Sequence, residues 1–296
     1  MRVSEFEVAT ADGRRLSARA AGPEDGAVVI YHSGTPGTRF MFDGYLEEGA
    51  ERGLRHVCYS RPGYDGSDRL PGRSVADSSA DTMAVADELG AERFYVVGHS
   101  GGGTPALSDA AQFPARVIAA AVLATFAPRG AEGLDWRAGT EGANGGELAA
   151  LEAGDAALER LLEGFARDFR EVEHGSQVRE AFQDTLCQAD LGTLTGRFLR
   201  YQVESFPLAV RGGIWGWLDD DKAVWGDWGF DLADIAVPVS IWQGREDGIV
   251  PAAHAEWLAA HVPGARLHLL AEDGHLSVMR HHYGAILDEL IELGGV

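Results

Sequence analysis

The chain has 296 residues and a formal net charge of −21 at pH 7, with 45% apolar and 24% charged residues. These values are typical of a globular protein and argue against a disordered chain and a coiled coil. A surface this acidic repels phosphate backbones and anionic lipids, and no run of 18 apolar residues occurs, so we expect neither a nucleic-acid nor a membrane partner. The polar N-terminus lacks the apolar core of a signal peptide, which indicates a cytoplasmic protein.

The first 126 residues alternate strand-like runs with helical segments. Apolar repeats and turn signals predict a hairpin over 3–8 and 16–20, strands at 27–32, 56–60, 93–98 and 117–123, and helices at 38–53, 77–89 and 104–113. Repeated strand-helix-strand order with apolar strands predicts a mostly parallel sheet flanked by helices.

The pattern changes near Ala127 and returns near Ile235. The chain between these residues reads as helical, acidic and rich in glycine turns, whereas a strand at 239–243, a helix at 252–261, a strand at 266–270 and a helix at 276–293 follow it. We therefore predict one α/β fold in two parts, 1–126 and 235–296, with a helical cap at 127–234 inserted after the sixth strand. Insertions of this length are usually functional lids.

A glycine-rich turn, Gly98-His99-Ser100-Gly101-Gly102, lies between a predicted strand and a predicted helix. This G-x-S-x-G pattern is typical of a nucleophile elbow, in which small residues on both sides let a strand turn sharply into a helix. The turn projects the Ser100 hydroxyl above the sheet edge, next to a helix N-terminus that favours negative charge. We interpret Ser100 as the nucleophile and His99 as a structural residue that faces away from it.

A serine nucleophile needs a base and an acid that orients the base. His275 follows the strand 266–270 on the same side of the sheet as the elbow, so it is the candidate base. Asp247 follows the strand that begins at Val239 and precedes the Gly248 turn, so it is the candidate acid, with Glu246 as the alternative.

The order Ser100, Asp247, His275 resembles the α/β-hydrolase fold family over nearly the whole chain. The loop Tyr31-His-Ser-Gly-Thr-Pro-Gly37 is similar to the family's H-G-x-P-G loop, and residues 61–68 are similar to its R-P-G-x-G-x-S loop. The resemblance implies an oxyanion hole formed by the backbone N–H groups of Thr35 and Gly101. The sequence departs from the family pattern at Ser33, where a second histidine is frequent, and at Asp65, where glycine is common.

We expect a serine hydrolase that cleaves a carboxylic ester or lactone through an acyl-enzyme on Ser100, acts on a small molecule and needs no cofactor or metal. Epoxide hydrolase and dehalogenase activities are disfavoured, since their relatives attack with a carboxylate at the elbow. Candidate substrate contacts are His32, Trp215 and Trp217. The alternative role of His32 is to order a loop, and the alternative role of the two tryptophans is to pack the cap onto the sheet. The oligomeric state is left open.

Two alternatives remain at this point. A proline iminopeptidase-like aminopeptidase would hold a substrate amine on acidic cap residues such as Glu204 or Asp219-Asp220-Asp221, although we expect the three aspartates to form a solvated turn. A non-hydrolytic enzyme of this fold, or a ligand-binding protein, is the other alternative. Covalent labelling of Ser100 and turnover would separate these alternatives from the hydrolase.

Overall fold

The computed structural model describes residues 2–139 and 143–295. Eight strands form one sheet in the order β1-β2-β4-β3-β5-β6-β7-β8, in which β1, β2 and β4 pair antiparallel and all other neighbours pair parallel. The predicted mostly parallel sheet is therefore confirmed. The strands are β1 (Val3–Ala9), β2 (Arg15–Ala21), β3 (Ala27–His32), β4 (Leu54–Tyr59), β5 (Phe94–His99), β6 (Val117–Leu123), β7 (Val239–Gly244) and β8 (Arg266–Leu270).

Helices cover both faces of this sheet, as the sequence predicts. The apolar side chains of α2, α3 and α10 belong to the core on one face, and those of α1 and α11 belong to the core on the other. These flanking helices are α1 (Asp43–Glu51), α2 (Ser78–Glu88), α3 (Gly103–Gln112), α10 (Ala252–His261) and α11 (Ser277–Gly294).

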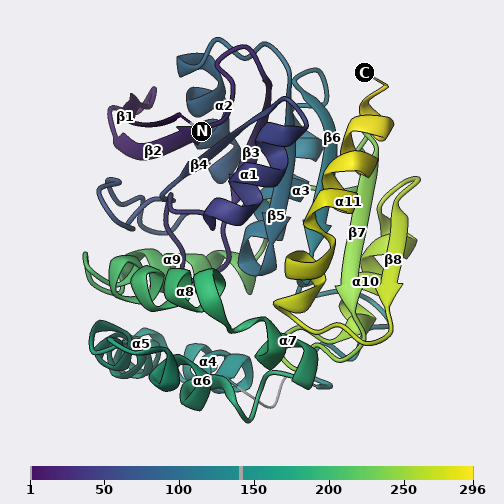
Figure 1. The fold of residues 1–296 in the computed structure, drawn as a ribbon. Helices are drawn as coiled ribbons and strands as arrows, with labels where there is room; N and C mark the ends of the chain where they lie inside the picture. Colours follow the sequence, from purple (N-terminus) through teal and green to yellow (C-terminus); the bar gives the residue numbers. More distant parts are fainter. Residues whose placement is uncertain (1, 140–142, 296) are drawn as a thin grey trace.

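Among the described residues, six further α-helices lie between β6 and β7 in the chain, and we call them the helical segment. They are α4 (Ala143–Glu152), α5 (Asp155–Arg170), α6 (Gly175–Phe182), α7 (Gln188–Thr193), α8 (Gly196–Ala209) and α9 (Trp215–Val224). Figure 1 shows the helical segment across the end of the sheet toward which β7 and β8 point. Within the described residues, no helix combines the length and the apolar character that crossing a lipid bilayer requires.

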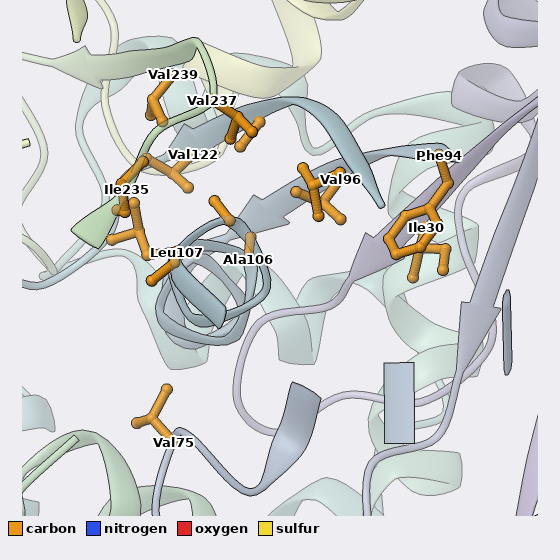
Figure 2. Packing of buried hydrophobic residues seen from close by; sticks show 14 of the residues in the cluster. Ile30, Val75, Phe94, Val96, Ala106, Leu107, Val122, Ile235, Val237 and Val239 are labelled. Atoms are coloured by element: carbon orange, nitrogen blue, oxygen red, sulfur yellow. The ribbon is translucent and has the colours of Figure 1, made fainter. Parts of the chain in front are cut away.

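Alternate residues of the central strands enter opposite cores, as a sheet buried on both faces requires. Val96 of β5 packs in the core that contains α3, whereas its neighbour Val97 packs in the core that contains α11. Figure 2 shows Ala106 and Leu107 of α3 facing Val96 and Val122 of the sheet. Each fully buried aliphatic side chain of this kind contributes roughly 1.5–3 kcal/mol, so the central strands provide a rigid support for the loops at their ends.

The largest difference from the predicted boundaries is at the first helix. The helix predicted to begin near Thr38 begins at Asp43, because residues 38–42 run without helical structure and bury Met41 and Phe42 in the core. The apolar spacing that suggested a helix there instead reflects side chains that a loop carries into the protein.

Candidate active site

The turn after β5 holds Ser100 in a strained backbone conformation. Ser100 has φ 56°, a left-handed value that non-glycine residues rarely adopt and that costs on the order of 1–3 kcal/mol. A Cβ atom on Gly98 would lie 2.2 Å from the carbonyl oxygen of Gly102, and one on Gly102 would lie 2.2 Å from that of His32. The two glycines are therefore required by space, and the turn has the geometry that the G-x-S-x-G pattern predicts.

His275 and Asp247 meet at the ends of β8 and β7. The Nδ1 atom of His275 lies 3.0 Å from Oδ2 of Asp247, and both side chains are buried. Asp247 is fixed by three donors: the N–H groups of Ile249 and Val250 donate to Oδ1 at 2.8 and 2.9 Å, and Gln243 Nε2 donates to Oδ2 at 3.0 Å. Glu246, the alternative acid, is exposed. Of the two candidates, the structure brings only Asp247 to His275.

Electrostatics favour a proton on the His275 imidazole. Burial lowers the pKa of His275, but the charge of Asp247 and its hydrogen bond to the ring outweigh burial, so the pKa is raised above its ordinary value. This arrangement stabilises the imidazolium that forms when a histidine accepts a proton from a nucleophile.

His99 contacts the main chain of His275. Its Nε2 atom lies 2.9 Å from the His275 carbonyl oxygen, so Nε2–H donates, and the two ring centroids are 4.9 Å apart. Burial, reinforced by the charge of His275, lowers the pKa of His99 to about 4, which keeps the ring neutral at pH 7. The expected structural role fits this geometry, although the ring also lines the cavity described next.

A cavity of about 690 Å³ opens between the sheet end and the helical segment. Ser100, His275 and Thr35 line it from the sheet side, and Trp217 lines it from the helical segment. A Cβ atom on Gly101 would lie 3.5 Å from the backbone nitrogen of Thr35, so these two main-chain segments are adjacent. Among the described residues, the Thr35 N–H has no hydrogen-bond acceptor.

The lining of the cavity combines aromatic rings with carboxylates. Trp217 stacks against Phe165 and Phe169, with ring centroids 5.8 and 5.5 Å apart. Four carboxyl groups line the cavity, whereas none of its lining residues among those described is an arginine or lysine. The four are Glu147, Asp168, Glu171 and Glu180.

Glu147 is the buried member of these four carboxyl groups, and it lies at 6% exposure. Burial raises the pKa of Glu147 to about 8, against a smaller opposing effect from a hydrogen bond with Trp217. Asp221 of α9 lies close enough for the two carboxyls to repel each other, and burial together with Glu147 raises the pKa of Asp221. Glu147 therefore holds a proton at neutral pH, and the pattern of the sequence did not indicate this pair of carboxyls.

Two of the three expected substrate contacts do not line this cavity. His32 is 2% exposed, does not line the cavity, and places Nε2 2.8 Å from Oδ2 of Asp109 in α3, so it ties β3 to a helix instead. Trp215 is 42% exposed and lies with its ring 4.5 Å from the Arg69 guanidinium, outside the cavity. Trp217 alone of the three reaches the cavity.

The expected solvated turn at Asp219-Asp220-Asp221 is also wrong, since all three residues are buried in α9. Asp219 pairs with Arg69, and Asp220 pairs with Arg61 and Arg73. The three arginines lie in the loop after β4, so charge pairing draws α9 onto the sheet end. Glu204, the other acidic candidate, is exposed and does not line the cavity.

A group of possible metal ligands lies near the start of α11. Asp273 accepts hydrogen bonds from His281 and His282, each at 2.8 Å, and their donor atoms lie within 4.8 Å of one another. Each oxygen of the Asp273 carboxylate already accepts a hydrogen bond from one of the two rings. We therefore assign this group to the packing of the 273–275 loop against α11.

Fold and site together define an α/β protein in which a strained serine turn and a buried histidine, paired with a carboxylate, line the same cavity. A family model described as alpha/beta hydrolase fold matches residues 27–281, and the chain belongs to this family. The resemblance inferred from the motifs is thereby confirmed.

Relatives of known name support a hydrolase of this fold. The chain is 29% identical over 237 residues to a pimeloyl-[acyl-carrier protein] methyl ester esterase of Nitrosomonas europaea, covering 79% of this chain and 83% of the relative. It is 26% identical over 281 residues to a 2-hydroxy-6-oxononadienedioate/2-hydroxy-6-oxononatrienedioate hydrolase of Burkholderia vietnamiensis, covering 90% and 86%. The crystal structure of a hydrolase from Pseudomonas aeruginosa PA01 shares the fold, with a TM-score of 0.71, 22% identity, and coverage of 97% and 98%.

Proposed function

We propose that the protein is a serine hydrolase that cleaves a carboxylic ester or lactone through an acyl-enzyme on Ser100. The observation that carries this proposal is that the strained Ser100 turn and His275, which is paired with Asp247, line the same cavity. A serine held at a costly backbone angle beside a buried histidine–aspartate pair is the arrangement that nucleophilic acyl transfer requires.

In the proposed reaction, the Ser100 hydroxyl attacks the substrate carbonyl carbon while His275 accepts the hydroxyl proton at Nε2. Asp247 keeps Nδ1 protonated and stabilises the imidazolium. The N–H groups of Thr35 and Gly101 donate to the oxyanion of the tetrahedral intermediate, and His275 then gives its proton to the leaving alcohol. Water, activated by the same histidine, attacks the acyl-enzyme and releases the acid. Each oxyanion donor contributes on the order of 3 kcal/mol to transition-state stabilisation.

We further propose that residues 127–234 act as the cap that closes this site. The aromatic face formed by Phe165, Phe169 and Trp217 suits an apolar acyl or alcohol group. The carboxyl-rich lining, which contains no arginine or lysine, disfavours an anionic substrate such as the dioate in the name of the Burkholderia vietnamiensis relative. We therefore expect neutral esters and lactones to be the better substrates.

A second candidate is an aminopeptidase that holds a substrate amine. Glu147 favours it, because a bound ammonium group would stabilise the ionised form of this nearly buried carboxyl in a cavity without arginine or lysine. The position differs from the Glu204 expected from the sequence. Aminoacyl p-nitroanilides and their N-acetylated forms separate the two candidate functions, since only an enzyme that binds the free amine would prefer the unacetylated substrates.

The test is intact mass spectrometry after treatment with a fluorophosphonate, on wild type and Ser100→Ala. The proposal expects one adduct on wild type and none on the variant. A panel of neutral esters, lactones and aminoacyl substrates then identifies the class that is turned over. Absence of an adduct on folded wild-type protein would overturn the proposal and favour a binding protein.

A further inference from the structure

Two buried carboxylates of the helical segment hold the loops of the proposed active site. The first is Asp190 of α7, which is fully buried. Its carboxylate accepts the N–H groups of His275, Leu276 and Ser277 at 2.9, 2.9 and 2.8 Å, and the Ser277 hydroxyl at 2.7 Å. These donors form the N-terminal end of α11, where a negative charge is favoured. Asp190 therefore fixes the main chain that carries His275.

The second carboxylate, Asp220 of α9, holds the loop that contains Thr35. Its Oδ2 atom accepts the Thr35 hydroxyl at 2.9 Å and the Tyr64 hydroxyl at 2.9 Å. Arg61 donates to the same oxygen and also to the carbonyl groups of Ser33 and Gly34. Main chain and side chain of residues 33–35 are thus tied to α9 through one carboxylate.

The hydrogen bonds of Asp220 are strong because the groups that form them are charged and buried. Asp220, Arg61 and Arg73 are all at most 7% exposed. Burial raises the pKa of Asp220, but the charges of Arg61 and Arg73 outweigh burial and hold it far below its ordinary value. The carboxylate is therefore ionised throughout the neutral range, and charge-assisted hydrogen bonds to it are about twice as strong as neutral ones.

We propose that Asp190 and Asp220 are positioning residues through which the helical segment sets the geometry of two loops. These are the loop that carries His275, here called the base loop, and residues 33–35, here called the oxyanion loop. This inference rests on the proposed function. It assigns the segment a second role besides covering the cavity: displacing α7 would release the His275 loop, and displacing α9 would release the Thr35 loop.

The two residues act on different steps, which makes the inference separable from a general effect on folding. Asp247, Asp190 and His99 all face His275, and the Asp190 charge helps to raise the pKa of that histidine. Removing the charge therefore shifts the pH dependence of activity. Asp220 is balanced by two arginines and contacts Thr35, so its removal alters the oxyanion loop and leaves the histidine ionisation in place.

The experiment compares Asp190→Asn and Asp220→Asn in the full-length protein, with p-nitrophenyl acetate as the substrate. Asp220→Asn should lower kcat about 10- to 100-fold, since an oxyanion donor is moved from its position, with KM and the pH midpoint close to wild type. Asp190→Asn should move the midpoint of the kcat/KM profile to lower pH. The rate of Ser100 labelling by a fluorophosphonate should fall in parallel with kcat.

Two matched controls remove a carboxylate without touching either loop. Asp219→Asn breaks the ion pair between Asp219, which neighbours Asp220 on α9, and Arg69 of the loop after β4. Asp184→Asn removes an exposed charge before α7. Both should keep wild-type kcat and pH profile within a few-fold. If Asp220→Asn does not fold, Thr35→Val and Thr35→Ser replace it, because only the serine variant retains the hydroxyl that Asp220 accepts.

The outcomes separate this inference from the proposed function. If wild type is neither labelled nor turns over the ester, the proposed function is overturned and the inference with it. If wild type reacts and Asp220→Asn and Thr35→Val match Asp219→Asn, or Asp190→Asn keeps the wild-type pH midpoint, positioning by the helical segment is overturned while the hydrolase assignment stands.

Discussion

The sheet and the helical segment contribute to the site in different ways. At the sheet end, close-packed backbone fixes the turn that carries Ser100, because Gly98 and Gly102 leave no room for a side chain. In the helical segment, single carboxylates such as Asp190 and Asp220 hold loops far away in the chain through ion pairs and hydrogen bonds. The Ser100 turn therefore depends on local geometry, whereas the positions of the Thr35 and His275 loops also depend on contacts between distant parts of the sequence.

The largest expected effect lies at the sheet end. Ser100→Ala and His275→Ala should each reduce ester hydrolysis by on the order of 10⁴-fold or more, since either change removes the proposed nucleophile or its proposed base. Steady-state kinetics with p-nitrophenyl acetate measure this effect, and circular dichroism verifies that the variants fold. Activity within a few-fold of wild type in either folded variant would refute the assignment.

The acid gives a matched pair of adjacent residues. Asp247→Asn should cost roughly 10⁴-fold in kcat, because the amide no longer holds the histidine in the reactive tautomer. Glu246→Gln should stay within a few-fold, because Glu246 is exposed. A larger loss in Glu246→Gln than in Asp247→Asn would transfer the role to Glu246.

Glycine substitutions compare the two regions by stability. In Gly102→Ala, the added Cβ would lie 2.2 and 2.5 Å from the carbonyl oxygens of His32 and Ser33, so we expect a loss of about 3 kcal/mol or more. In Gly164→Ala, within α5, the Cβ meets nothing within 4 Å, and we expect a gain of up to about 1 kcal/mol. Urea unfolding measures the free energy of unfolding of both variants, and equal changes would contradict the proposed difference between the sheet end and the helical segment.

The pH dependence of stability tests the buried acid of the helical segment. The pKa of Glu147 is raised from 4.5 to about 8, so the folded state binds more protons than the unfolded chain between these values. Stability should therefore fall as the pH rises from 5 to 8. Glu147→Gln should flatten this decline in thermal unfolding, whereas Asp168→Asn, in the same cavity but exposed, should retain it. An unchanged slope in Glu147→Gln would exclude the raised pKa.

The smallest expected effect distinguishes two tryptophans of α9. Trp217→Phe should change KM for esters of different acyl length, because Trp217 lines the cavity. Trp215→Phe should leave kcat and KM within about two-fold of wild type, as expected for an exposed ring outside the site. A larger effect from Trp215→Phe would restore the substrate contact that the sequence suggested.

The sheet could be predicted from sequence because its signals are local. Apolar strands, glycine turns and the G-x-S-x-G spacing placed Ser100, Asp247 and His275 at one edge, and the structure brings His275 and Asp247 together there. The helical character of the segment could also be predicted, but its contacts with the sheet end could not. Asp219 pairs with Arg69, which lies 150 residues earlier, and Asp190 accepts a hydrogen bond from His275, which lies 85 residues later. Because these partners are distant in sequence, the run of aspartates at 219–221 suggested a solvated turn, whereas in the structure it is buried.

His32 and Trp215 do not line the cavity, for a related reason. Each side chain contacts another group instead: His32 contacts the buried carboxylate of Asp109, and Trp215 contacts the guanidinium of Arg69. Glu147 carried no recognisable signal, because its raised pKa depends on burial in a cavity that several helices of the helical segment form together with the sheet end.

The most direct test of the central claim is to trap the acyl-enzyme. Wild-type protein is mixed with p-nitrophenyl acetate, quenched in acid within the first turnover, digested and analysed by peptide mass spectrometry. The account predicts a burst of p-nitrophenol matching the enzyme concentration and an acetyl group on Ser100, both absent in Ser100→Ala. Hydrolysis that proceeds without a burst or an acetylated Ser100, and persists in the variant, would contradict it.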